Sequence, residues 1–323
     1  MIVKKLELPI RIRKLEALLR RLSSTHHKRE LIEADLAKIY AGYKGENSIQ
    51  YFLDLLPKQE FFIFHDLRIP NENHFFQIDI LILSNSFILI LEVKNIYGTL
   101  YFDQNFNQLI RTANNKEEGF PDPIIQAKRH QLQLENWLKY RAKTNLPIES
   151  FVVISNPASI LKTDNNNKNI GKKVIHAHVL LDKVEELIRR YANQTLDSKS
   201  KQRITKLLLK DHKLETFSVL EKYQICKEEV ITGVICPKCN NHKMTRSHGT
   251  WYCENCQTKD KLAHIQAIYD YFLLLSSSIT NQQARDFLLL ASEDTVARLL
   301  QQMKLPQTGA KKGRVYYPPT TYL

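Results

Sequence analysis

The chain has 323 residues and a formal net charge of +13, with 25% charged and 43% hydrophobic residues. This length exceeds that of a typical single domain, so we expect two or three domains, the largest with a sizeable core. The positive charge favours a polyanionic partner, nucleic acid or a membrane surface, over an acidic small molecule. No run of about 18 apolar residues or signal-peptide-like segment is found, and we expect a soluble, cytoplasmic protein without membrane contacts.

Residues 10–44 carry Leu and Ile at helical spacing among many charged residues, which predicts one or two amphipathic helices. A further helix is expected to open at Gly45-Glu46 and to run to residue 56. A strand should follow over residues 61–69. On these grounds alone, Glu46 is a carboxylate that favours the dipole at a helix start.

The most informative stretch is residues 77–94, QIDILILSNSFILILEVK, with two short apolar runs separated by serine and asparagine. Such runs predict a hairpin of strands that is covered on both faces. Glu92 and Lys94 would share a strand face, and the tight turn would bring Asp79 beside them. Two carboxylates in a low dielectric repel each other, and a divalent cation would keep both ionised. The alternative is an edge strand with a solvated ion pair.

The next part of the chain is expected to complete the sheet. Residues 99–102 predict a short strand and residues 103–123 a loop. Pro123 should open a helix that reaches about residue 141 and carries Lys128 and Arg129 on its early turns. These two side chains would contact phosphate or belong to an ordinary polar surface. Strands over residues 151–155 and 174–179 would follow.

The pattern Ile78-Asp79, twelve intervening residues and Glu92-Val93-Lys94 resembles the D…ExK core of the PD-(D/E)XK nuclease superfamily, with Ile78 in place of proline. Further matching residues are Lys44-Gly45-Glu46, Gln77, Asn95 and the segment 123–126. With them, roughly the first half of the chain resembles the nuclease-related domain (NERD) family. This implies an α/β (α+β) fold with a restriction-endonuclease-like core, in which helices flank a central mixed sheet.

The resemblance also implies a function, hydrolysis of DNA phosphodiester bonds in DNA processing or defence. Mg²⁺ (or Mn²⁺) would be held by Asp79, Glu92 and the Val93 backbone carbonyl. Lys94 would orient the attacking water or neutralise developing charge. The family pattern adds Glu46, which would complete the metal site directly or through water, and Gln126, which would approach the site. The alternative is a non-catalytic DNA-binding or regulatory protein with the same residues as a structural polar cluster.

Two CxxC pairs form the strongest local signal in the chain. Cys236 and Cys239 are followed, after thirteen residues, by Cys253 and Cys256. Four thiolates on two short turns around a hairpin predict a structural, tetrahedral Zn²⁺ site of the zinc-ribbon type, with no open coordination position. A redox CxxC is disfavoured because two pairs are present without a βαβ pattern. Cys226 lies outside this spacing and is interpreted as a buried apolar residue.

The last segment predicts three helices, over residues 262–275, 280–290 and 292–303, and a strand over residues 313–317. The second and third helices resemble a helix-turn-helix, and the strand would be the wing of a winged-helix-like module. No acidic residue follows Asp294, so we expect a phosphate-binding surface that includes Arg285, Arg298, Lys311, Lys312 and Arg314. A helical module for self-association, which would give a homodimer, is the alternative.

These patterns predict four parts of the chain. Residues 1–195 would form the nuclease-like domain, made of N-terminal helices over 10–44 and a core over 45–195. A helical connector would occupy residues 196–232. The zinc ribbon would span residues 233–258 and the winged-helix-like module residues 259–323.

Overall fold

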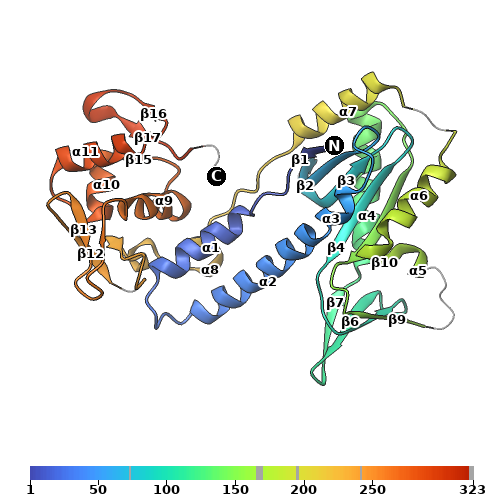
Figure 1. The fold of residues 1–323 in the computed structure, drawn as a ribbon, viewed down its shortest axis with the longest axis horizontal. Helices are drawn as coiled ribbons and strands as arrows, with labels where there is room; N and C mark the ends of the chain where they lie inside the picture. The colour runs from blue at the N-terminus through green and yellow to red at the C-terminus, as the bar shows by residue number, and fades with distance from the viewer. Residues whose placement is uncertain (73, 165–169, 194–195, 241, 320–323) are drawn as a thin grey trace. The chain divides into compact units, whose positions relative to one another are not determined.

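The computed structural model describes the chain except for residues 73, 165–169, 194–195, 241 and 320–323 (Figure 1). Its internal contacts divide the chain into two compact units. Unit 1 comprises Met1–Glu7 and Tyr40–Glu215, and unit 2 comprises Leu8–Ile39 and Thr216–Leu323. The chain passes from unit 2 to unit 1 within helix α2, Arg29–Ser48.

This division differs from the expected domain boundary, because helix α1, Ile10–Arg21, belongs to unit 2. The buried side chain of Arg21 donates to Asp270 Oδ2 at 2.8 Å, in helix α9, His264–Leu274, and to the Gly233 carbonyl at 2.6 Å. Separating a buried ion pair leaves an uncompensated charge, so this contact ties α1 to the C-terminal residues. The sequence pattern showed that α1 is amphipathic but not which partner covers its apolar face.

Unit 1 is built around a six-stranded mixed sheet of order β1-β2-β3-β4-β8-β10. The strands are β1 Ile2–Lys4, β2 Phe62–Asn71, β3 His74–Leu83, β4 Ile88–Lys94, β8 Ile148–Ile154 and β10 Val174–His176. The central pairs β2–β3 and β3–β4 are antiparallel, and the pairs β1–β2, β4–β8 and β8–β10 are parallel. The expected mixed sheet is therefore confirmed.

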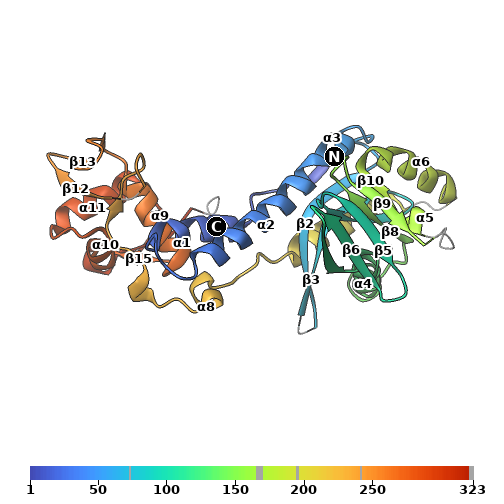
Figure 2. The ribbon, with the colours of Figure 1, turned by 90° about the horizontal axis from the view of Figure 1, so that it is seen from below.

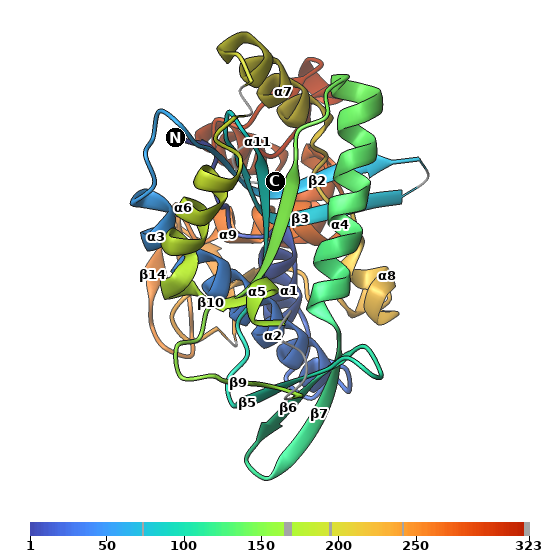
Figure 3. The same ribbon diagram turned by 90° about the vertical axis from the view of Figure 1, so that its right-hand side faces the viewer.

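Helices cover both faces of this sheet (Figure 3). Helices α3, Gln50–Asp54, and α6, Leu180–Arg190, pack on one face through residues such as Leu53 and Leu187. Helices α4, Pro123–Trp137, and α7, Ser198–Asp211, pack on the other through Leu134 and Leu208. Helix α7 therefore belongs to unit 1 and is no connector, because its apolar side completes the core.

The hairpin expected over residues 77–94 is present as β3 and β4. Its pairs run from Ile80–Leu91 to Leu83–Ile88. The Ser84 hydroxyl accepts hydrogen bonds from the backbone N–H groups of Ser86 and Phe87, at 3.0 and 2.9 Å, and thereby closes the turn. The two strands that carry the candidate site are thus held in a fixed register.

The prediction of a loop over residues 103–123 is wrong, because this segment contains two strands. A second sheet of order β7-β6-β5-β9 consists of β5 Thr99–Asp103, β6 Gln108–Ala113, β7 Lys116–Pro121 and β9 Ile160–Thr163. Asn114 and Asn115 have φ values of 51° and 58°, as a two-residue hairpin turn requires. Strand β7 is polar and largely exposed, so it carries no apolar alternation by which it could have been predicted.

Three helix and strand ends also differ from the prediction. Helix α2 continues without a break through Gly45 and Glu46. Helix α4 ends at Trp137 and is followed by a π-helical turn, Leu138–Ala142. Strand β10 ends at His176, and the 3₁₀ turn Ala177–Val179 leads into α6. Such differences at the ends of helices and strands are common, because the backbone conformations on the two sides of a boundary are similar.

Unit 2 contains the four cysteines and the C-terminal helices. The short strands β11 Val234–Ile235, β12 Lys243–Ser247, β13 Thr250–Tyr252 and β14 Lys259–Asp260 form an antiparallel sheet. The remaining elements are α8 Val219–Tyr223, α9, β15 Ile279–Thr280, α10 Asn281–Leu288, α11 Glu293–Gln302, β16 Gln307–Thr308 and β17 Val315–Tyr316. The three predicted helices and their caps at Thr280 and Ser292 are confirmed.

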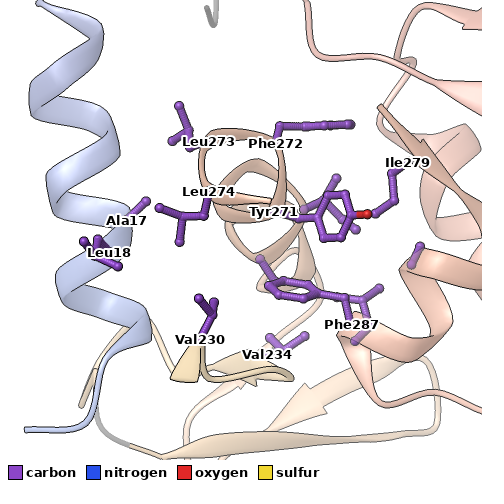
Figure 4. Packing of buried hydrophobic residues seen from close by; sticks show 14 of the residues in the cluster. Ala17, Leu18, Val230, Val234, Tyr271, Phe272, Leu273, Leu274, Ile279 and Phe287 are labelled. Atoms are coloured by element: carbon purple, nitrogen blue, oxygen red, sulfur yellow. The ribbon is translucent and has the colours of Figure 1, made fainter. Parts of the chain in front are cut away.

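One core runs through unit 2, as Figure 4 shows. Leu18 of α1 and Leu274 of α9 belong to the same buried cluster as Val234 of β11 and Phe287 of α10. The ribbon and the C-terminal helices were expected as separate parts, and this shared core joins them. Among the helices of the described part of the chain, none has the length and apolar character needed to cross a membrane.

Candidate active site and metal centre

Three carboxylates lie in one row across adjacent strands of unit 1: Asp66 in β2, Asp79 in β3 and Glu92 in β4. The β2–β3 pairs continue on both sides of Asp66 and Asp79. The last β3–β4 pair, Ile80–Leu91, lies one residue from Asp79 and Glu92, so the two strands separate where these side chains lie. Sequence reasoning identified Asp79 and Glu92 but missed Asp66.

In both β2 and β3, the side of the strand that faces the core changes at this row. Phe64 and Leu67 of β2 enter the same core cluster although they are three residues apart, and so do Ile78 and Leu81 of β3. Strict alternation would place residues three apart on opposite faces, so both strands depart from alternation here, although their pairing register is unchanged. At this point Asp66 has a φ of 49°, in the left-handed region. The irregularity takes the two aspartates out of the regular alternation of the sheet.

The Asp79 carboxylate is held by the backbone of the neighbouring strand. Its Oδ2 accepts a hydrogen bond from Val93 N at 2.8 Å. Burial, and next the charge of Glu92, raise the pKa of Asp79 to about 8. The site therefore holds this carboxylate in place while making its ionisation unfavourable without a compensating charge.

Glu92, Lys94 and Gln126 meet on the side of the sheet that α4 covers. Lys94 Nζ donates to Glu92 Oε1 at 2.7 Å and to Gln126 Oε1 at 3.2 Å. Glu92 is only 1% exposed, whereas Lys94 is half-buried. The structure thus brings together the glutamate and lysine expected to share a face, and it adds Gln126 from α4.

His130 is a further member of the site that sequence reasoning missed. It lies one helical turn after Gln126 on α4, with Nδ1 3.4 Å from Glu92 Oε2. Burial alone would raise the pKa of Glu92, but His130 and the charge of Lys94 outweigh burial and lower it. The i, i+4 spacing from Gln126 was the signal that could have identified His130.

Glu46 approaches the same carboxylates from α2. Burial, and next the charges of Asp79 and Asp66, raise the pKa of Glu46 to about 9. The interpretation of Glu46 as a helix-start residue is wrong, because it lies two residues before the C-terminal end of α2 at Ser48. A helix C-terminus disfavours a carboxylate, so helix stability gives no reason for an acid here.

Gly45 allows α2 to approach the ends of β4 and β8 closely. A Cβ on Gly45 would lie 2.5 Å from Asn95 Cβ and 3.0 Å from Ser155 Oγ. Asn95 also donates from Nδ2 to the Ala41 carbonyl at 2.8 Å. This close contact brings Glu46 beside the strands, which gives a physical reason for glycine before that glutamate.

The carboxylates have the chemistry of a divalent-cation site. Among the described residues, however, the four cysteines are the group of three or more His, Cys, Asp or Glu side chains already placed to hold a metal ion, with their sulfurs within 4.8 Å of one another. However, Glu92 Oε2 is buried without a hydrogen-bond partner in the described part of the chain. Burial, and next the repulsion between carboxylates, raise the pKa values of Asp79 and Glu46, and a cation would offset both. These residues therefore fit a divalent cation.

The predicted nucleic-acid contacts differ in accessibility. Lys128 and Arg129 are exposed on α4, as are Arg298, Lys311 and Lys312 in unit 2, and Arg314 is half-buried. Arg285 instead donates to the Ala291 carbonyl at 3.3 Å and to Gln282 within its own helix. Its guanidinium is therefore engaged in holding the α10–α11 turn.

The four predicted zinc ligands converge in unit 2. Cys236 Sγ lies 3.5 Å from Cys256 Sγ, and Cys239 Sγ lies 3.7 Å from Cys253 Sγ. Tetrahedral zinc with Zn–S bonds of about 2.3 Å separates its sulfurs by roughly 3.8 Å, so the cluster fits this ion. The four-cysteine cluster supports the predicted zinc ribbon.

The two cysteine turns have the same backbone design. Asn240 and Gln257 each follow the second cysteine of a pair and have φ values of 54° and 58°. Their N–H groups donate to the carbonyls of Cys236 and Cys253, at 2.9 and 2.8 Å. Cys226 lies outside this cluster and is exposed, so its interpretation as a buried residue is wrong.

Comparisons with known proteins bear on unit 1 most directly. Residues 41–155 match the family model described as NERD, nuclease-related domain. No curated protein matches the chain. Among solved structures, the chain is similar to protein VC1899 from Vibrio cholerae, at 11% identity and a TM-score of 0.26. That match covers 58% of this chain and 58% of the other, so the chain spans little more than half of that protein's length.

Proposed function

We propose that this chain, which contains a nuclease-related domain over residues 41–155, is a Mg²⁺-dependent nuclease that hydrolyses DNA phosphodiester bonds in DNA processing or defence. One observation carries the proposal. Lys94 contacts both Glu92 and Gln126, and Asp79 lies beside Glu92 where β3 and β4 separate. Two acids and a lysine in this arrangement, within the matched region, are the groups that metal-assisted hydrolysis of a phosphodiester requires.

The metal would be held by Asp79, Glu92 and the Val93 carbonyl, with Glu46 contributing directly or through water. A bound Mg²⁺ or Mn²⁺ ion polarises the phosphate and lowers the pKa of a bound water. Asp79 and Glu46 must lose their protons to bind it, because their pKa values are raised to about 8 and 9. Metal and protons therefore compete for these carboxylates.

Lys94 is the cationic group next to the reacting phosphate. Its ammonium is oriented by Glu92 on one side and Gln126 on the other, at 2.7 and 3.2 Å. Held in this way, it orients the attacking water or neutralises charge on the phosphate oxygens. His130 is a positioning residue, because it contacts Glu92 Oε2 rather than Lys94.

Nucleic acid would be bound by exposed cations in both units. Lys128 and Arg129 serve this role on α4. In unit 2 the order of α9, β15, α10, α11, β16 and β17 is that of a winged helix, and β17 pairs with both β15 and β16. Phosphate contacts would come from Arg298, Lys311, Lys312 and Arg314, with the smallest share from Arg285.

The second candidate is a DNA-binding or regulatory protein without catalysis. One observation favours it: among the described residues, the cysteines and not the unit 1 carboxylates form a group placed to hold a metal ion. Cleavage of linear, circular and single-stranded DNA by the full chain, with and without added Mg²⁺, decides between the two. The nuclease proposal expects cleavage with Mg²⁺ only, and binding without cleavage under both conditions would support the alternative.

A further inference from the structure

The β2–β3 hairpin continues beyond the carboxylate row as a two-stranded arm (Figures 2 and 3). We use the term arm for residues 67–71 of β2 and 74–78 of β3. Its pairs run from Leu67–Ile78 to Asn71–His74, whereas β4 pairs with β3 only from Ile80 onward. The arm thus extends the sheet outward from the point where Asp66 and Asp79 lie.

The two faces of the arm differ in burial. One face enters the core that α7 helps to cover, through Leu67, Ile69, Phe76 and Ile78. The opposite face carries the intervening residues Arg68, Pro70, Phe75 and Gln77, all half-buried or exposed. Phe75 is 46% exposed. Gln77 Nε2 donates to Asp66 Oδ1 at 2.5 Å, so this open face begins beside the carboxylate row.

A cation and an aromatic ring are stacked on the open face. The Arg68 guanidinium carbon lies 3.6 Å from the centre of the Phe75 ring. Backbone contacts anchor this arginine, because Lys213 N donates to its carbonyl at 2.9 Å and its NH1 donates to the Leu214 carbonyl at 3.4 Å. No carboxylate of the described residues forms an ion pair with Arg68.

We infer that the open face of the arm binds single-stranded DNA next to the candidate active site, with a base stacked on Phe75 and a phosphate at Arg68. Exposed aromatic rings accept bases of any sequence, and an unpaired arginine supplies the charge that a phosphate requires. Asp79 lies four positions after Phe75 along the strand, a length of about 13 Å. A stacked strand advances about 3.4 Å per nucleotide, so the base on Phe75 lies within about four nucleotides of the scissile phosphate.

This inference rests on the proposed function, but its test measures binding without cleavage. The full chain carrying Lys94→Ala, in buffer without added Mg²⁺, is titrated with a single-stranded oligonucleotide that contains 2-aminopurine, whose fluorescence falls when it stacks. We expect Phe75→Ala to weaken binding about tenfold and to abolish the quenching at one position. Phe75→Trp should preserve both. Arg68→Gln should lower the salt slope of binding by about one.

The matched control is Tyr140→Ala. Tyr140 is 75% exposed in the turn after α4, at the opposite end of that helix from Gln126. The Tyr140→Ala variant should bind the oligonucleotide as tightly as the chain that carries Lys94→Ala alone. Equal affinity of the Phe75→Ala and Tyr140→Ala variants would overturn the inference. So would full rescue by Phe75→Leu, because leucine restores apolar cover without an aromatic face.

Two further outcomes separate this inference from its rivals. A change in subunit number in Phe75→Ala, at unchanged affinity, would assign the arm to self-association and overturn the inference. Loss of oligonucleotide binding in Phe75→Ala, together with a wild-type chain that never cleaves DNA with Mg²⁺, would support the arm and reject the nuclease. Thermal unfolding of each variant checks that the fold is retained.

Discussion

The two candidate metal centres are assembled in opposite ways. The cysteine centre of unit 2 lies within residues 236–256, and its four sulfurs are already within 4.8 Å of one another. The carboxylate centre of unit 1 draws Glu46 from a helix and Asp66, Asp79 and Glu92 from three strands, and it is not among the described side-chain groups already placed to hold a metal ion. Neighbouring CxxC turns fix ligand geometry locally, whereas carboxylates on separate elements depend on the whole sheet.

This difference also determines what each metal would contribute. The ribbon has short strands of two to five residues and needs its ion to hold them together. The sheet of unit 1 has its own core, and its carboxylates are held close in spite of their repulsion. Zinc is therefore expected to stabilise the fold, and Mg²⁺ to complete a site that the fold has already built.

The largest effect should follow removal of zinc. Structural zinc binding contributes roughly 10–16 kcal/mol in isolated fingers, so chelation or Cys253→Ser should unfold residues 233–258. Purified protein should contain about one zinc per chain. Metal analysis and hydrogen exchange measure the two effects, with Cys226→Ser as the control that leaves both unchanged. A metal-free ribbon with protected amides would refute the structural role.

The second prediction concerns pH in the metal-free protein. Unfolded carboxylates titrate near pH 4, whereas the pKa values of folded Asp79 and Glu46 are raised to about 8 and 9. Between these values the folded state binds more protons than the unfolded state, so stability falls as pH rises. In buffer without added Mg²⁺ and without a chelator, Tm should be lower at about pH 8.5 than at about pH 6, by about 2–4 °C for each kcal/mol lost.

Magnesium should restore more stability at the higher pH, because there the carboxylates have largely lost the protons that compete with the metal. Asp79→Asn is the matched variant, since its side chain cannot ionise, and it should flatten the pH dependence. A wild-type Tm that rises between the two pH values would contradict the electrostatic description of the site.

A third test compares two glycines of α2. Gly45→Ala places a Cβ 2.5 Å from Asn95 Cβ and should destabilise unit 1 by about 1–3 kcal/mol. Gly42→Ala meets no atom within 4 Å in the same helix and should stabilise it by up to about 1 kcal/mol. Denaturant unfolding measures both. Equal effects of the two substitutions would show that α2 does not approach the strands closely.

The smallest expected effect concerns the basic end of unit 2. Deletion of residues 260–323 would remove α9 from the shared core, so neutralisation of single charges is the cleaner test. Lys311→Ala with Lys312→Ala should lower the salt slope of DNA binding by about two without a change in molecular mass. Lys227→Ala, an exposed lysine next to two glutamates, is the control. A changed mass at constant slope would favour the self-association alternative.

Sequence reasoning succeeded where chemistry is encoded by short spacing. The hairpin over residues 77–94 and the cysteine turns follow from runs and intervals that allow few other structures. It failed where the signal lies in contacts between distant residues. Asp66 can be assigned to the site only when its position opposite Asp79 in the β2–β3 pairing is known. His130 can be assigned to it only when the contact of α4 with Glu92 is known.

The same limit explains the domain boundary. Helix α1 has an apolar face, but only the buried pair of Arg21 with Asp270, 249 residues apart, shows which unit it completes. Strand β7 was missed for a different reason, since its residues are polar and exposed and carry no pattern of burial. The sequence therefore predicted most of the candidate site residues. It did not predict how the helices and strands bring those residues together.

The central claim is that Asp79, Glu92 and Lys94 form a catalytic centre. The most direct test compares DNA cleavage and DNA affinity of the wild type with those of Lys94→Ala, with Lys139→Ala as the control for charge on an exposed surface of unit 1. We predict that Lys94→Ala loses cleavage by at least about 100-fold while its affinity stays nearly unchanged, because cations elsewhere supply most of the binding. Equal cleavage by Lys94→Ala and the wild type would contradict the assignment of this site.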